Sequence, residues 1–193
     1  MADRRAETTR ESRNMLIVAA TALFVEKGYQ QTTFADVAER SGISRGSIPW
    51  HFGNKDGLLV AVLDHASEAL LEGSDDADST RAPRPDDFVV QTKRSSMVRT
   101  SLLFVALYVE AVDPQSPIHD RYVALHDRLR DAAKRWINAF VRLPDAVTAD
   151  DLAVILVGAA IGIHLQAAMA PERIRMDHAV DKLGALLDAT LLG

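Results

Sequence analysis

The 193-residue sequence contains no cysteine, which excludes disulfide bonds, thiolate metal ligands and cysteine nucleophiles. Aromatic residues make up only 6% of the chain, and an overall basic surplus is missing, because the formal net charge is −5. The first third is nevertheless balanced, with eight basic and eight acidic side chains in residues 1–65. The negative charge therefore lies in the rest of the chain, and the balanced segment remains compatible with a nucleic-acid partner.

The N-terminal segment lacks the apolar core of a secretion signal, because residues 1–14 are polar and charged. We therefore expect a cytoplasmic protein. Four of these side chains are arginines: Arg4, Arg5, Arg10 and Arg13. A flexible arm before residue 14 would let them reach DNA phosphates or a minor groove, and the alternative is an ordinary disordered terminus.

Long apolar runs are also scarce. The best candidate, residues 152–163, ends before His164 and is too short to span a bilayer. It predicts a helix that is buried on most faces. Gly158 and Gly162 lie one helical turn apart and would let a second helix approach closely, so together with Leu165 they are predicted to form a homodimer interface.

Local signals in the first third predict two short helices joined by a tight turn. Thr33 precedes an apolar-periodic run and is followed three residues later by Asp36, which is a capping-box arrangement at a helix start. Gly42 stands where a left-handed residue would end that helix. Ser44 is predicted to cap the next one.

The second of these helices is the candidate reader of DNA. Ile43 and Ile48 occupy the positions of a hydrophobic staple around Ser44, which would fix the angle at which the helix starts. Two helices joined in this way are typical of a helix-turn-helix motif, whose second helix enters the major groove.

The same stretch resembles the signature of the TetR family of transcriptional regulators: a Thr-Thr pair, a Gly-hydrophobic-Ser turn, a recognition helix ending in Tyr-x-His-Phe, and a following Lys. The matching residues are Thr32, Thr33, Gly42, Ile43, Ser44, Ile48, His51, Phe52 and Lys55. The match extends over residues 12–66. It implies a symmetric, all-helical homodimer that represses promoters and releases DNA when a small molecule enters its C-terminal domain. Residues 1–53 are then the expected DNA-binding domain, and residues 54–193 the effector-binding and dimerisation domain.

One position departs from the family pattern, because Pro49 stands where the family usually has Tyr. With Ser44 as the N-cap, Pro49 would be the fifth residue of the helix. There it cannot donate to the carbonyl of Arg45, and an interior proline costs up to about 3 kcal/mol. Tightening or fraying of the first turn would lower that cost. We expect altered operator preference or weaker DNA binding, with the fold retained.

The resemblance assigns most of the predicted DNA contacts. The family pattern places Arg45, Gly46 and Ser47 in or beside the major groove, where the guanidinium of Arg45 would bond guanine O6 and N7. The matching phosphate contacts are Thr33, Ser47, Trp50, His51 and Lys55, with Ser44 beside them. Packing between helices is the alternative for the two rings at positions 50 and 51. The core is predicted for Ile48 and Phe52.

A few bulky side chains stand on the otherwise aliphatic C-terminal helices: Phe104, Tyr108, Trp136, Phe140, His164 and Met169. The first five are the predicted ligand-binding residues, because they would line an apolar cavity with a few polar tips. An apolar or aromatic effector is expected. Tyr108, Trp136 and His164 are the strongest candidates, since their polar atoms need partners when buried. The alternative for each is an ordinary place in the core.

Eight or nine helices and no strand are expected, so the predicted fold class is all-α. Residues 73–87 predict a mobile loop, and Phe88 to Val112 predicts a helix with a break near Ser95 and Ser96.

Neither a metal site nor a cofactor is indicated. His119 and His126 share a helical face but are about 10 Å apart along it, too far for one ion. No catalytic constellation is present either, so an enzyme is not favoured. The main interpretation is a ligand-responsive regulator of transcription. The alternative is a small-molecule-binding protein whose DNA reading is impaired by Pro49.

Overall fold

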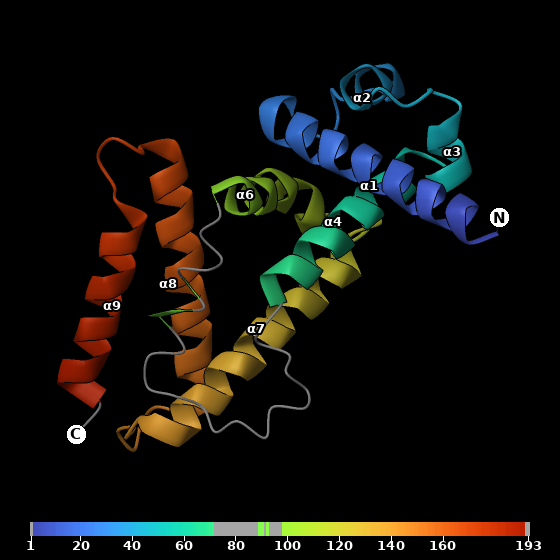
Figure 1. Cartoon of the computed structure of the whole chain (residues 1–193). Helices are drawn as coiled ribbons and strands as arrows, with labels where there is room; N and C mark the ends of the chain where they lie inside the picture. Colours follow the sequence, from blue (N-terminus) through green and yellow to red (C-terminus); the bar gives the residue numbers. More distant parts are fainter. Residues whose placement is uncertain (1, 72–88, 91, 93–97, 192–193) are drawn as a thin grey trace. The chain divides into compact units, whose positions relative to one another are not determined.

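The computed structural model describes residues 2–71, 89–90, 92 and 98–191, and within these ranges it contains eight named helices and no strand (Figure 1). The helices are α1 (Ala2–Lys27), α2 (Phe34–Ser41), α3 (Ser47–Phe52), α4 (Lys55–Leu71), α6 (Val98–Val112), α7 (His119–Phe140), α8 (Ala149–Met169) and α9 (Met176–Leu191). The predicted all-α class is confirmed. The chain divides into two compact units: Met1–Ala69 with Leu103–Tyr122, and Leu70–Leu102 with Val123–Gly193.

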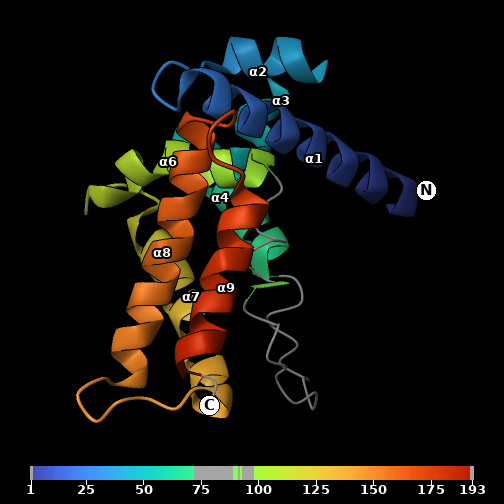
Figure 2. The same ribbon diagram turned by 90° about the vertical axis from the view of Figure 1, so that its left-hand side faces the viewer.

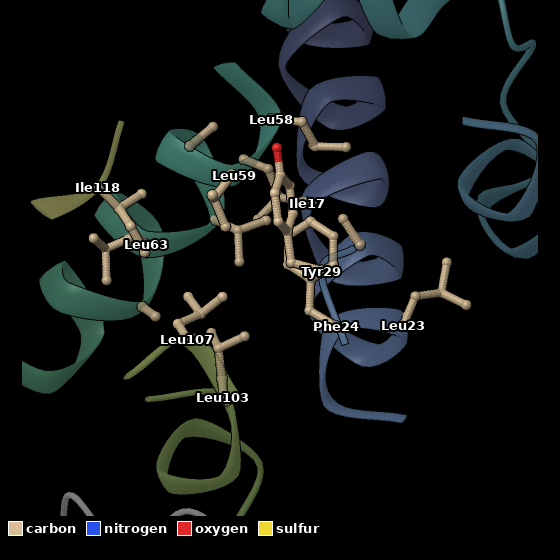
Figure 3. Close-up of a cluster of buried hydrophobic side chains, with 14 of the residues drawn as sticks. Ile17, Leu23, Phe24, Tyr29, Leu58, Leu59, Leu63, Leu103, Leu107 and Ile118 are labelled. Carbon is tan, nitrogen blue, oxygen red and sulfur yellow. The ribbon is translucent and has the colours of Figure 1, made fainter. Parts of the chain in front are cut away.

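The first unit is built on a core between α1, α4, α6 and the start of α7 (Figure 3). Its fully buried large side chains are Leu16, Ile17, Phe24, Ile48, Leu58, Leu59, Leu63, Leu103, Leu107 and Ile118. Each such side chain contributes about 1.5–3 kcal/mol through its removal from water. The rings of Phe24 and Tyr29 meet edge to face with centroids 5.5 Å apart. The helix-turn-helix segment therefore rests on a well-packed base.

Helix α1 begins earlier than the sequence analysis predicts. A flexible arm was expected before residue 14, but the helix runs without interruption from Ala2 to Lys27. The structure thus replaces the arm with a helix, because the segment is rich in Ala, Arg and Glu and contains no proline or glycine. The helix ends at Lys27, before Gly28, whose φ of 82° lies in the left-handed region.

The second unit contains most of α7 together with α8 and α9, and the last two lie side by side (Figure 2). Its buried cluster consists of Ala133, Trp136, Ile137, Leu152, Ala153, Leu156 and Leu187. A capping box starts α8, because the Thr148 hydroxyl accepts from the Asp151 N–H at 3.1 Å and the Asp151 carboxylate accepts from the Thr148 N–H at 3.0 Å. These bonds fix where α8 begins.

Helix α8 is strongly apolar and only partly covered. Its most apolar window has a mean hydropathy of 2.0, and 17% of that window is buried. By length and composition alone the whole helix, residues 149–169, is long enough to cross a membrane, although its uninterrupted apolar run is shorter; one helix of this kind does not establish a membrane span. Leu152 and Leu156 face the core of the unit, whereas Val154 and Ile155 are 57% and 60% exposed. The expected burial on most faces is therefore not reached within one chain.

Two predictions lie outside the described residues: the mobile loop at residues 73–87 and the break near Ser95 and Ser96. The predicted domain boundary after residue 53 stays a prediction. In the structure α4 packs through Leu58 and Leu59 into the same core as α1, so the compact unit extends beyond the first three helices.

Candidate nucleic-acid interface

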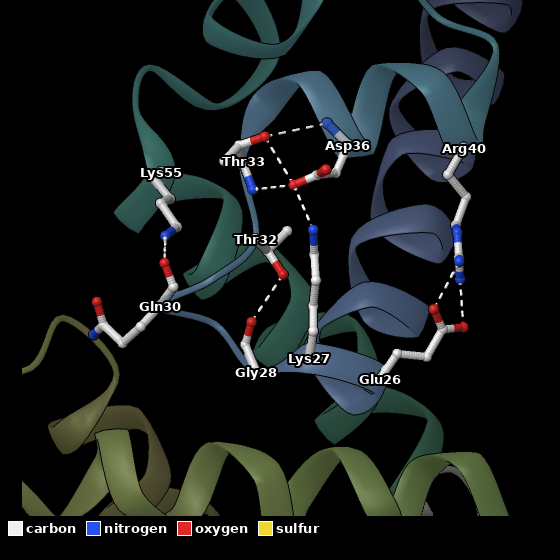
Figure 4. A network of polar contacts seen from close by, with 9 residues as sticks. All are labelled: Glu26, Lys27, Gly28, Gln30, Thr32, Thr33, Asp36, Arg40 and Lys55. Atoms are coloured by element: carbon white, nitrogen blue, oxygen red, sulfur yellow. Dashed lines mark hydrogen bonds and ion pairs between the residues drawn. The ribbon is translucent and has the colours of Figure 1, made fainter.

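The start of α2 is fixed by the predicted capping box (Figure 4). The Thr33 N–H donates to Asp36 Oδ2 at 2.7 Å, and the Asp36 N–H donates to the Thr33 hydroxyl at 3.3 Å. Lys27 adds an ion pair of 2.6 Å to the same carboxylate. These hydrogen bonds, from Lys27 first and from Thr33 next, lower the pKa of Asp36 to about 2. The Thr33 hydroxyl, a predicted phosphate contact, is thus already engaged in the cap.

The turn between the two helices has the predicted geometry. Gly42 has a φ of 72°, and its N–H donates to the Ala38 carbonyl at 3.0 Å. Only glycine adopts this left-handed conformation without strain. Ile43 is half-buried beside the fully buried Ile48. Because α3 starts at Ser47, the two isoleucines do not occupy the predicted staple positions around Ser44, and α3 is held by the contact of Ile48 with the core.

The recognition helix starts later than predicted, which corrects the assignment of Ser44 as its N-cap. The helix begins at Ser47, and Gly46 is the cap residue without a side-chain cap bond. Ahead of it the Ser47 N–H donates to the Ser44 carbonyl at 3.0 Å, a tighter three-residue turn. Pro49 is the physical reason. A start at Ser47 makes it the third helical residue, where its missing N–H needs no partner within the helix.

The exposed side of α3 carries the predicted DNA-reading residues. Arg45 and Gly46 are exposed, Ser47 is half-buried, and Trp50 is 70% exposed. The Trp50 indole stands edge-on to the His51 ring, with centroids 4.6 Å apart. Within the first unit Trp50 is therefore not packed between helices, which was the alternative for this ring. The opposite side of α3 is buried through Ile48, as predicted, so one face of the helix holds it and the other faces solvent.

His51 and Lys55 are less free than the sequence analysis assumes. Burial, and secondarily the charge of Arg13, lowers the pKa of the half-buried His51. The Lys55 ammonium donates to the Gln30 carbonyl at 3.0 Å and lies 4.4 Å from the centroid of the Tyr29 ring (Figure 4). Both side chains therefore have contacts within the protein that compete with a phosphate.

The predicted ligand-binding residues fall into separate groups. Phe104 and Tyr108 lie on α6 in the first unit, with ring centroids 6.2 Å and 6.3 Å from that of Tyr122. The Tyr122 hydroxyl donates to the Phe104 carbonyl at 2.8 Å. Tyr122 was not among the predicted residues, because the helical periodicity of α7 does not show which of its side chains meet α6. In the second unit Trp136 is buried, and its ring centroid lies 6.1 Å from that of Phe140.

His164 lies on α8 and is half-buried. Its Nδ1 is 2.6 Å from the Ala160 carbonyl, so Nδ1 carries the proton and donates. Its Nε2 is buried and finds no hydrogen-bond partner among the described residues. An acceptor nitrogen is therefore left for a bound molecule or a water.

The predicted dimer residues lie on the uncovered part of α8. A Cβ atom added to Gly158 or Gly162 would meet nothing within 4 Å, and Leu165 is exposed. Packing within the described chain thus does not require glycine at either position. Among the described residues no group of three or more His, Asp or Glu side chains could hold a metal ion.

Residues 16–62 match the family model described as bacterial regulatory proteins, tetR family. The chain is 44% identical over 68 residues to the HTH-type transcriptional regulator TtgR of Pseudomonas putida. That match covers 35% of this chain and 32% of TtgR, so it spans about a third of the relative's length.

Similarity to solved structures extends over nearly the whole chain. A transcriptional regulator from Rhodococcus sp. Rha1 has a TM-score of 0.78 at 19% identity, covering 94% of this chain and 98% of its own. A transcriptional regulator from Saccharomonospora viridis, solved in complex with choline, has a TM-score of 0.75 at 19% identity, covering 95% and 99%. At these identities the similarity shows a shared fold.

Proposed function

Because the chain belongs to the TetR family of bacterial regulatory proteins, we propose that it is a DNA-binding transcriptional regulator that responds to a small molecule. It represses transcription from a near-palindromic operator and is released when the effector binds. The proposed site of action is the cytoplasm, where the operator is found. Neither catalysis nor a cofactor is part of the proposal.

The observation that carries the proposal is that α3 has one buried face and one face exposed to solvent. Ile48 is fully buried, Trp50 on the same helix is exposed, and Arg45 is exposed in the turn just before it. An exposed helix with a free guanidinium at its start fits the major groove of DNA, where arginine pairs with guanine. Ser44, Gly46 and Ser47 complete the proposed reading surface.

The structure also weakens the argument for a protein with impaired DNA reading. Pro49 occupies the third position of α3, where the helix tolerates it, so the helix-turn-helix keeps its fold. Because α3 starts at Ser47, Arg45 lies in the turn before the helix and not in its first turn as predicted, which supports the proposal of altered operator preference. No observation favours small-molecule binding as the only function.

Dimerisation is proposed to use the exposed apolar face of α8. Val154, Ile155 and Met169 are 57%, 60% and 70% exposed, and a soluble protein rarely leaves so many large apolar side chains on one helix uncovered. Gly158 and Gly162 would allow a second helix to approach, and Leu165 continues the surface. Two copies related by a two-fold axis would present two α3 helices to the half-sites of a palindrome.

The effector is proposed to be a small apolar or aromatic molecule. Phe104 and Tyr108 offer ring contacts in the first unit, and Trp136 and Phe140 offer them in the second. His164 Nε2 supplies a polar atom without a partner. The effector must favour the conformation that fits DNA poorly, because only a difference in affinity shifts a population.

The test is a fluorescence-anisotropy titration of the purified protein against DNA from upstream of its own gene and against a scrambled duplex, at two salt concentrations. We expect tight binding to the first duplex only, weakened by salt. Equal and weak binding to both would contradict regulation of its own gene. The absence of any DNA binding at low salt would contradict the proposed function itself.

A further inference from the structure

Some basic side chains of the first unit form ion pairs or hydrogen bonds within the protein, and others do not. Those described on α1 to α4 and their loops are Arg10, Arg13, Lys27, Arg40, Arg45 and Lys55. Lys27 and Arg40 are paired with the carboxylates of Asp36 and Glu26, at 2.6 Å and 2.5 Å. Lys55 donates to a backbone carbonyl. Within the described residues only the other three lack such a partner, and all three are exposed.

Of these three, Arg13 is held against the recognition helix. Its guanidinium carbon lies 5.4 Å from the centroid of the Phe52 ring, and Phe52 is the last residue of α3. A stacked guanidinium is attracted by the face of the ring while the N–H groups at its edge stay free to donate. The contact therefore restrains where the charge sits without using its hydrogen bonds.

The surroundings of Arg13 fit an anion. Burial and the nearby guanidinium both disfavour the charged form of His51, so the imidazole is neutral near pH 7. The positive charge at this end of α3 accordingly belongs to Arg13. The exposed Trp50, whose ring contacts that of His51 with centroids 4.6 Å apart, carries a further donor in its indole N–H. No carboxylate is paired with Arg13 within the described residues, so its charge has no counter-ion among them.

We propose that Arg13 binds a phosphate of the DNA backbone next to the C-terminal end of α3, while Arg45 reads DNA at the start of the same helix. The guanidinium fork matches two phosphate oxygens, and the Phe52 ring orients it before DNA arrives. The contact comes from α1, outside the helix-turn-helix motif, and fixes the register of α3 without reading sequence. This inference rests on the proposed function.

The salt dependence of DNA binding by Arg13→Gln tests the proposal. Full-length wild type and variant are titrated by fluorescence anisotropy against DNA from upstream of the gene and against a scrambled duplex, over a series of salt concentrations. The slope of log K against log salt should become shallower by about 0.9 for each Arg13 that contacts DNA. The loss should be similar on both duplexes, because a phosphate contact is independent of sequence. Arg13→Lys keeps the charge and should keep the slope.

Arg173→Gln is the matched control, since it removes the same charge from an exposed position in the second unit. It should leave affinity and slope unchanged. Thermal unfolding of each variant shows whether the fold survives. If Arg13→Gln has the slope of the control while wild type binds DNA, the proposal is overturned and Arg13 only packs on Phe52. If wild type binds neither duplex at low salt, the proposed function fails first.

Discussion

Gln30 links two helices of the first unit that are distant in sequence. Its side-chain amide donates to both carboxylate oxygens of Glu110 on α6, at 3.1 Å and 2.9 Å. Its backbone carbonyl accepts from Lys55, the first residue of α4. The loop before α2 is therefore tied to α4 and to α6 through a single residue.

The side-chain link is exposed, so its contribution to stability should be small. In a double-mutant cycle of Gln30→Ala and Glu110→Ala, we expect a coupling energy of about 0.5–1 kcal/mol in urea unfolding. The control cycle pairs Gln30→Ala with Glu172→Ala, an exposed carboxylate in the second unit, and should be additive. A coupling energy near zero in the first cycle would contradict the hydrogen bond.

Pro49→Tyr should strengthen DNA binding. The family pattern assigns the missing tyrosine to the DNA backbone, and one hydrogen bond to a charged phosphate is worth roughly 1.5 kcal/mol, or about tenfold in affinity. Position 49 is exposed, so the larger side chain has room. Anisotropy titration measures the gain. Pro49→Ala restores the N–H without the phenol and should gain less; an equal gain would point to the backbone instead of the hydroxyl.

Trp50→Ala should weaken DNA binding with little effect on stability. Because the side chain is 70% exposed, the free energy of unfolding should change by no more than about 0.5 kcal/mol. The DNA affinity should fall for operator and scrambled duplex alike, since a phosphate contact carries no sequence information. In a Trp136→Phe background the remaining Trp50 fluorescence should respond to DNA. An unchanged spectrum on saturation with DNA would show that α3 does not face the duplex.

Acid should remove the contribution of Asp36. Its pKa is lowered from 3.8 to about 2 in the folded chain, so the folded state binds this proton less readily than the unfolded state. The resulting stability is present above about pH 4 and is lost as the pH falls toward 2. The difference in thermal midpoint between wild type and Asp36→Ala should therefore shrink over this window. Asp151→Ala should follow the same direction, because its cap also lowers that pKa. A difference that stays constant down to pH 2 would argue against the linkage.

Gly158→Leu should break the dimer and leave the protomer folded. A Cβ at this position meets no atom within 4 Å in the described chain, and leucine favours a helix over glycine by roughly 0.8 kcal/mol. Sedimentation velocity should show a shift toward monomer, and operator affinity should fall with it. Asn138→Leu adds the same side chain to an exposed position on α7 and should remain dimeric. A dimeric Gly158→Leu protein would exclude this face as the interface.

The sequence alone determined the local features of this protein. The capping box at Thr33 and the left-handed Gly42 follow from neighbouring residues, so their signals are contained in a few positions. The all-α class follows from helical periodicity. The destabilising effect of Pro49 inside a helix was also predictable, since a proline affects the helical turn in which it lies.

Only the tertiary structure decided which side chains from distant segments meet. The stacking of Arg13 on Phe52 and the bonds from Gln30 to Glu110 join residues far apart in the chain, and helical spacing does not specify such partners. The start of α3 at Ser47 also depended on structure, because local sequence offered both Ser44 and a tightened turn. Burial on the core through Ile48, together with the proline at the third position, selects the second arrangement.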